Sequence, residues 1–121
     1  QFVPAVGPFA CGMRVEVPLH AAILAEGTGG EAVWQALADR YRNEPFVELA
    51  AYTGLEPVSE AQLDPTALND TNRLRIHLNP NVQGHILLVG ILVNLGEGAA
   101  GVAIQNLNLM LGLGEQTGLP V

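Results

Sequence analysis

Cys11 and His20 are the first two side chains along the chain that could act together in chemistry. A cysteine thiolate is a nucleophile, and a neighbouring histidine can lower the pKa of the thiol. Between the two residues, however, apolar and polar side chains alternate as they do in an extended strand. Nine residues of extended chain span about 30 Å, so the two side chains meet only if the chain turns back. The sequence therefore favours a small structural thiol over a nucleophile.

His77 and His85 form a second candidate pair, on either side of the turn-forming segment Asn79-Pro80-Asn81. If the turn centres on Asn81, the two imidazoles lie opposite one another across a hairpin, close enough to share a metal ion. Asn79 and Asn81 are near, but no clear third ligand is evident in the sequence. We therefore expect an exposed polar pair and predict no metal site.

Arg73 and Arg75 are the third candidate, since two guanidinium groups two residues apart could hold an anionic substrate. The alternative is a solvated strand face, because arginine side chains mostly lie at the protein surface. The sequence favours the solvated face and leaves the substrate-binding alternative open.

The first elements that must position these residues are a strand and a helix. Alternation predicts a strand over Cys11–Leu19, with Pro18 near an edge. The spacing Thr28-Gly29-Gly30-Glu31 predicts a capping box that starts a helix, and Asn43-Glu44-Pro45 ends it. The apolar stripe of this helix consists of Val33, Trp34, Leu37, Ala38 and Tyr41.

The middle of the chain predicts a second strand, a long loop and a hairpin. The strand is expected over Phe46–Ala51, and the segment Leu55–Asn72 is either a functional arm or a surface loop with one helical turn. The hairpin joins Arg73–Leu78 to Val82–Leu95. Because Ile86–Val93 is almost wholly apolar, both of its faces should be covered, one by helices and one by a second subunit.

The last helix has two different faces. One carries the apolar residues Ala100, Ala103, Ile104, Leu107, Met110 and Leu111. The other carries Gly101, Gln105, Asn108 and Gly112, which suits close packing against another backbone or a cofactor's hydrogen-bonding edge. The order strand, helix, strand, hairpin, helix predicts an α+β fold with a mostly antiparallel or mixed sheet and helices on one face. We expect a single domain over 1–121.

Composition excludes several classes of function. The chain has 121 residues, 49% of them hydrophobic, and a net charge of −7 with five arginines and no lysine. This balance argues against nucleic-acid and anionic-membrane partners, and the missing lysine excludes Schiff-base chemistry and a P-loop. One cysteine rules out an internal disulfide and favours a reducing compartment such as the cytoplasm. The sequence carries no spanning segment or signal peptide, and it begins at Gln1 as if excised from a longer chain.

The C-terminal third resembles the end of N-acetyl-gamma-glutamyl-phosphate reductases, the NADP-dependent arginine-biosynthesis enzymes of the aspartate-semialdehyde-dehydrogenase type. The resemblance rests on VNLGEGAAGVAIQN at 93–106 and TGL at 117–119. Upstream, FVPAVGPFACGMRVEVPLH at 2–20 and ALNDTNR at 67–73 match the shorter-chain branch of the family. The resemblance implies a fold like the C-terminal domain of glyceraldehyde-phosphate-dehydrogenase-type enzymes.

The same resemblance implies an incomplete enzyme. The family's nucleophilic cysteine, its histidine and its Rossmann domain lie before the point where this sequence begins, so we expect no catalytic residue here and no activity alone. The chain would supply substrate and NADP contacts and a homo-oligomer interface through Ile86–Val93. The resemblance leaves open whether the acyl substrate is a glutamyl or a longer aminoadipyl compound. The alternative is a non-catalytic, self-associating scaffold, natural or engineered.

The resemblance also implies particular binding residues. Asn94 matches the asparagine that approaches the nicotinamide carboxamide, and Gly96 and Gly98 fit the same loop. Gln105, with Asn108, would lie on a face against the Rossmann domain, close to the cofactor. Gly12 and Arg73 are the candidate substrate-binding residues.

Three positions depart from the family pattern. Val93 replaces an aspartate, Glu97 replaces a lysine, and Cys11 stands where the family has arginine or glutamine. A negative charge in place of a positive one disfavours an anionic phosphate nearby, and a thiol cannot make the bidentate contact of arginine. These departures put catalytic competence in question.

Overall fold

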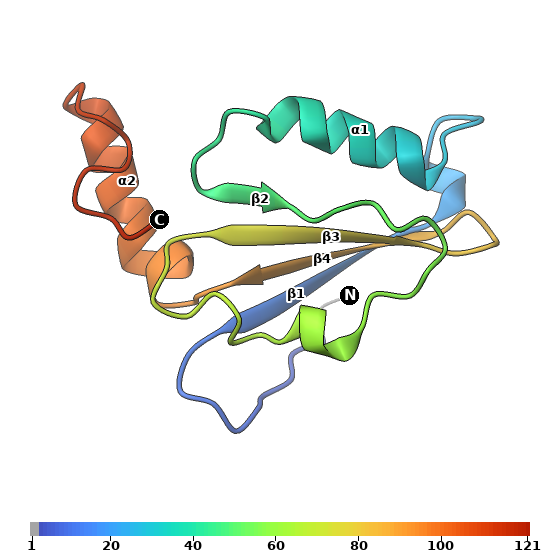
Figure 1. Cartoon of the computed structure of the whole chain (residues 1–121), viewed down its shortest axis with the longest axis horizontal. Helices are drawn as coiled ribbons and strands as arrows, with labels where there is room; N and C mark the ends of the chain where they lie inside the picture. Colours follow the sequence, from blue (N-terminus) through green and yellow to red (C-terminus); the bar gives the residue numbers. More distant parts are fainter. Residues whose placement is uncertain (1–2) are drawn as a thin grey trace.

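The computed structural model describes residues 3–121, which form a four-stranded sheet with two α-helices. The strands are β1 (Met13–Leu19), β2 (Val47–Leu49), β3 (Leu74–Pro80) and β4 (Ile86–Leu92), in the spatial order β1-β4-β3-β2. β4 pairs antiparallel with β1 and β3, whereas β2 pairs parallel with β3. The α+β class, the element order and the mixed sheet are confirmed (Figure 1).

One face of the sheet is covered by a loop, and we call it the loop face. Here Val89 and Ile91 are completely buried, and they pack with Leu68 and Val93 into the main hydrophobic cluster. Leu63 and Leu68 belong to the predicted loop 55–72, which contains one short helical turn at Glu60–Leu63. The predicted helical turn is thus confirmed, and a loop rather than a helix covers this face of β4.

The opposite face is covered in part by α1 (Gly30–Tyr41), and we call it the helix face. α1 packs against β2 and β3, and the Trp34 indole N–H donates to the Ala50 carbonyl at 2.9 Å. The predicted apolar stripe is its half-buried side. This cover does not reach β1, where Val15 and Val17 remain 41% and 46% exposed.

The predicted start of α1 is wrong in detail. The N-cap residue is Gly29, which has no side chain, so the Thr28–Glu31 capping box does not form. The first residue of α1, Gly30, lies close to the end of β3, since a Cβ on Gly30 would lie 2.9 Å from the Pro80 side chain. A capping box does form elsewhere, between Ser59 and Gln62 at the short turn in the loop. The start of α1 therefore lies against Pro80, where only a residue without a side chain fits at position 30.

The register of the hairpin differs from the prediction. His77 pairs with Val89, and Pro80 pairs with Ile86, so His77 and His85 do not face each other. The turn lies further along the chain because Asn81 Oδ1 accepts the N–H groups of Gln83 and His85, both at 3.0 Å. These contacts make residues 81–85 the loop and shift every pairing.

α2 (Gly101–Met110) stands beyond the end of the sheet where β4 ends, and the π-helical turn Gly96–Ala100 leads into it (Figure 1). Its small, amide-bearing face is the packed one, with Gly101 and Asn108 buried. The apolar face is exposed, with Ile104, Leu107 and Met110 at 42%, 51% and 83%. Within the described residues, no helix is long and apolar enough to cross a membrane.

His77 gives the fold a testable pH dependence. It is 4% exposed on the loop face, and burial lowers its pKa below the ordinary value, with a further lowering by Arg75 that Glu48 opposes. The unfolded chain therefore takes up a proton more readily than the folded one, so stability falls as the pH falls below the ordinary histidine pKa and is unaffected above it. Urea unfolding between about pH 8 and about pH 5 measures this loss.

His77→Gln keeps a polar side chain at this position but removes the titrating imidazole. We expect a smaller loss of stability on acidification in this variant than in the original chain. Equal losses in both proteins would show that His77 does not govern the acid response.

Candidate functional site

Residues from three distant segments meet at the end of the sheet where β1 begins and β4 ends. Met13 pairs with Leu92, so the residues just before β1 lie beside those just after β4. The Gly12 N–H donates to Asn94 Oδ1 at 3.1 Å. Two predicted binding residues are therefore in direct contact, and we call this end of the sheet the Asn94 site.

Gly12 is required by its backbone conformation and by its surroundings. Its φ is +109°, and a Cβ at this position would lie 2.3 Å from the carbonyl oxygen of Pro65. Only glycine adopts this conformation without strain and allows such a close approach. The 55–72 loop, which covers the hydrophobic cluster, thus also fixes Gly12 beneath the Asn94 carboxamide.

The glycines after Asn94 shape a compact turn. The Gly98 N–H donates to the Val93 carbonyl at 2.9 Å, and a Cβ on Gly96 would lie 3.1 Å from the Thr71 carbonyl oxygen. The backbone comes close to its neighbours here, as expected of a binding loop, and Asn94 itself is exposed. The side chain of Glu97 lies outside the described part of the structure.

Two cavities flank the Asn94 site, with volumes of about 490 and 280 Å³. Cys11 lines both, Asn94 lines the smaller one, and Gly96 lines the larger one. The Cys11 thiol is half-buried against the hydrophobic cluster, and His20 lies beyond the far end of β1. Strand β1 therefore separates this thiol from the imidazole, and the pair does not form a nucleophile.

The Asn94 carboxamide suits this site to the recognition of a polar group. Among the described residues that line the two cavities, Asp70 is the only carboxyl group outside the turn. Asn94 offers an exposed carboxamide whose orientation is set by the Gly12 N–H. An amide held in this way suits a neutral polar group with its own donor and acceptor.

The two arginines do not act as a pair. Arg75 makes two hydrogen bonds to Glu48 across β2 and β3, at 2.9 and 3.2 Å, so a carboxylate of the same sheet already neutralises its charge. Arg73 lies at the start of β3, and its Nε is buried without a hydrogen-bond partner among the described residues. Arg73 keeps donor capacity, and its predicted role toward substrate stays a prediction.

The amides of α2 contact the C-terminal segment of the same chain. Gln105 Nε2 donates to Glu115 Oε1 at 2.6 Å, while Asn108 Nδ2 donates to the carbonyls of Glu115 and Thr117 at 3.0 and 2.9 Å. Asn108 is 5% exposed. In this chain both amides therefore hold residues 115–117 against the helix, and among the described residues no hydrogen bond links Gln105 to the Asn94 site.

His20 and His85 contact each other at the opposite end of the sheet, with ring centroids 4.2 Å apart. Nδ1 of His85 accepts the Ala21 N–H at 3.0 Å, and Nδ1 of His20 accepts the Ala22 N–H at 3.2 Å. Each ring in its neutral form then carries its proton on Nε2. The sequence missed this pair because it depends on the register between β1 and β4, in which Leu19 pairs with Ile86.

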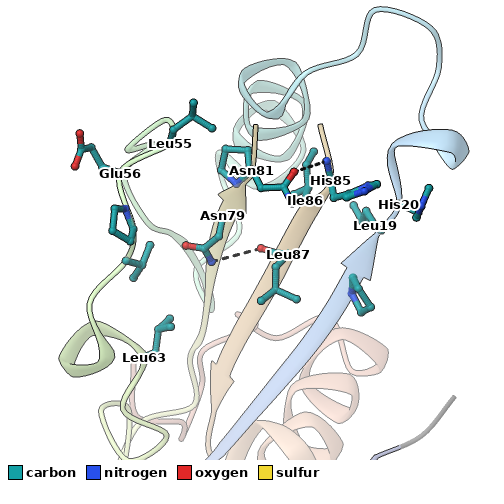
Figure 2. Close-up of a pocket in the computed structure, with 14 residues that line it drawn as sticks. Leu19, His20, Leu55, Glu56, Leu63, Asn79, Asn81, His85, Ile86 and Leu87 are labelled. Carbon is teal, nitrogen blue, oxygen red and sulfur yellow. Dashed lines mark hydrogen bonds between the residues drawn. The ribbon is translucent and has the colours of Figure 1, made fainter. Parts of the chain in front are cut away.

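Both imidazoles line a cavity of about 750 Å³ (Figure 2). Figure 2 shows Leu55, Glu56 and Leu63 on one side, and Asn79 with Leu87 across from them on the sheet. The described residues contain no group of three or more histidine, cysteine, aspartate or glutamate side chains that could hold a metal ion. The cavity is mainly apolar. The candidate binding residues Gly12 and Asn94, which the resemblance implied, lie at the other end of the sheet.

Comparison with known proteins shows which proteins have sequences similar to this chain. Residues 1–94 match the family described as semialdehyde dehydrogenase, dimerisation domain. N-acetyl-gamma-glutamyl-phosphate reductase of Trichormus variabilis is 44% identical over 121 residues, which is 98% of this chain and 37% of that protein. The protein of the same name from Burkholderia ambifaria is 40% identical, over 93% of this chain and 35% of its own length. The chain thus spans little more than a third of these relatives.

Gly12→Ala should disrupt the Asn94 site. The new Cβ meets the Pro65 carbonyl oxygen and forces a conformation that alanine avoids. We expect a loss of at least about 2 kcal/mol in the free energy of unfolding, measured by urea denaturation. Gly114→Ala is the matched control, because its Cβ would lie 3.5 Å from the nearest atom, the Thr117 hydroxyl. Similar stability of the two variants would contradict the close packing at Gly12.

Proposed function

Because the chain belongs to the semialdehyde dehydrogenase dimerisation-domain family, we propose that it is part of an N-acetyl-gamma-glutamyl-phosphate reductase of arginine biosynthesis. The observation that carries the proposal is the contact between Asn94 and Gly12 beside a glycine turn. This contact joins two segments that resemble the reductases. The chain contributes cofactor contacts and a subunit interface, and it acts in the cytoplasm, where Cys11 stays reduced.

The proposed role of Asn94 is to hold the carboxamide of a nicotinamide cofactor, NADP, whose reduced form would supply a hydride when bound. One lone pair of Asn94 Oδ1 accepts the Gly12 N–H, so the Nδ2 group is left to donate to a carbonyl oxygen. Gly96 and Gly98 allow backbone to pass close to the cofactor without side chains in the way. Gly12 and Arg73 are the candidate contacts for the acyl substrate.

The proposal requires a second protein segment. The nucleophilic cysteine, the histidine and the nucleotide-binding domain of the family would come from residues outside this sequence, so the chain alone is inactive. The exposed apolar face of α2 fits this requirement. Leu107 and Met110, with Ile104, expose a row of large apolar side chains that a covering domain would remove from water.

A homo-oligomer interface is proposed on the uncovered half of the helix face. β4 has a hydrogen-bonded neighbour on each side, so Ile86–Val93 can contact a second copy only through a face and not as an edge strand. Leu88 and Leu92 of β4 lie on the same face as Val15 and Val17 of β1, and Leu88 pairs directly with Val17. The proposed interface therefore includes β1 as well as β4.

The second candidate function is a non-catalytic, self-associating scaffold. The same exposed valines favour it, because they would drive association whether or not a catalytic domain is present. The departures at Val93 and Glu97 favour it as well, since the reductase pattern has charged residues there. The two candidates differ in whether NADPH-dependent activity appears when the remaining segment is supplied.

Solution mass tests the interface. Light scattering coupled to size exclusion, over a tenfold range of concentration, should give one stable oligomer. Val17→Asp places a charge on the proposed interface and should shift the mass to that of a monomer. Val82→Asp is the control, because Val82 is 78% exposed in the hairpin turn, away from the uncovered face. A monomeric original chain, or equal effects of both substitutions, would refute this interface.

Activity tests the reductase proposal. The chain joined to the segment that carries the cysteine and the nucleotide-binding domain should reduce N-acetyl-glutamyl phosphate with NADPH, and neither part alone should do so. Asn94→Ala should raise the KM for NADPH roughly tenfold, because about one hydrogen bond to the cofactor is lost. An inactive joined protein that nevertheless self-associates would favour the scaffold function.

A further inference from the structure

Asn72 lies at the point where the three segments around the Asn94 site converge. It is 1% exposed, just before β3, and it is among the most deeply buried side chains of the chain. Its backbone N–H donates to the Pro120 carbonyl at 2.9 Å, which ties the C-terminal segment to this point. Its side chain approaches both ends of the glycine turn that follows Asn94.

The Asn72 amide fits into this space because positions 96 and 101 are glycines, which carry no side chain. A Cβ on Gly101 would lie 1.6 Å from Asn72 Oδ1 and 2.5 Å from its Cγ. A Cβ on Gly96 would lie 3.3 Å from the same oxygen. The amide thus occupies the volume that a side chain at 101 would need, and it borders the first residue of the turn.

This packing determines where Asn94 can lie. Gly96 is two residues after Asn94, and the turn Gly96–Ala100 runs directly into Gly101. The amide of Asn72 therefore holds both ends of the turn, while the Gly12 N–H holds the Asn94 side chain itself. We propose that Asn72 is a positioning residue, which fixes the glycine turn and thereby the direction of the Asn94 carboxamide.

The inference goes beyond the proposed function, and its relevance to the cofactor rests on that function. Asn72 does not act on a reacting group. Together with the Thr71 carbonyl, which also lies against Gly96, it links the segment 67–73 to the turn 96–100, so a disturbance of one segment reaches the other. Asn72 lies within the ALNDTNR segment at 67–73, but its role is not apparent there, because the Asn72–Gly101 contact joins positions far apart in the chain.

The first test uses the 121-residue chain and nuclear magnetic resonance. Asn72→Ala should leave the amide signals of β3 and β4 in place, while the Gly12 amide should exchange with solvent at least about tenfold faster. Asn106→Ala is the matched control, because Asn106 is an exposed amide on α2. An unchanged Gly12 amide in a folded Asn72→Ala chain would overturn the proposal, and so would equal effects of the two substitutions.

A double-mutant cycle keeps the test decisive if Asn72→Ala weakens the whole fold. Gly101→Ala alone should strongly destabilise the chain, because the new methyl group meets the Asn72 amide. The same substitution in the Asn72→Ala chain should cost less, since the amide is gone and only the approach of the methyl group to the Gly96 carbonyl oxygen, at 2.8 Å, remains. Additive effects of the two substitutions on the urea midpoint would show that the amide does not occupy this space.

The last test separates this inference from the proposed function. In the joined, active reductase, Asn72→Ala should raise the KM for NADPH about as much as Asn94→Ala, with a smaller change in kcat. A lower kcat with an unchanged KM would overturn the positioning role. If Asn94→Ala itself has no effect on NADPH, the cofactor proposal fails, while the Gly12 exchange result still decides whether Asn72 positions Asn94.

Discussion

The pairing of β4 with both β1 and β3 is the constraint on which the rest of the structure depends. This strand is apolar on both faces, so it gains most from a central position, and the sheet order β1-β4-β3-β2 gives it one. Val89 and Ile91 bury completely under the 55–72 loop. The same antiparallel register places the residues before β1 beside those after β4, and the Asn94 site exists because of that juxtaposition.

At this site, small residues and buried amides replace the usual apolar packing. Gly12, Gly96 and Gly101 each have a neighbouring oxygen where a side chain would stand. Such packing brings three backbone segments close together and leaves little freedom for the exposed Asn94 carboxamide between them. A rigidly held amide is useful for recognition, because less entropy is lost when a ligand binds.

The exposed apolar surfaces are consistent with a chain that belongs to a larger assembly. The uncovered valines belong to β1. The exposed apolar side chains of Ile104, Leu107 and Met110 belong to α2, which stands beyond the end of the sheet (Figure 1). These two surfaces suit two different contacts, one with a second copy and one with the remaining segment proposed for the reductase. The matched relatives are almost three times as long as this chain, which leaves a large part of such a protein to cover these surfaces.

The sequence by itself determined the local elements and their order. Alternation along β1, the stripe of α1 and the apolar run of β4 are periodic signals, and each reports which side of an element is buried nearby. The close contact of Gly12 with Asn94 was not visible in the pattern, although both residues could be singled out by resemblance. Tertiary structure decided the buried face of α2, through Asn72 and Asn108, and the close packing of Gly30 on Pro80. The hairpin register follows from local hydrogen bonds to Asn81, which the hydrophobic pattern did not reveal. The contacts of Gly30 with Pro80 and of Gly101 with Asn72 join residues distant in the chain, and such contacts leave no periodic trace in the sequence.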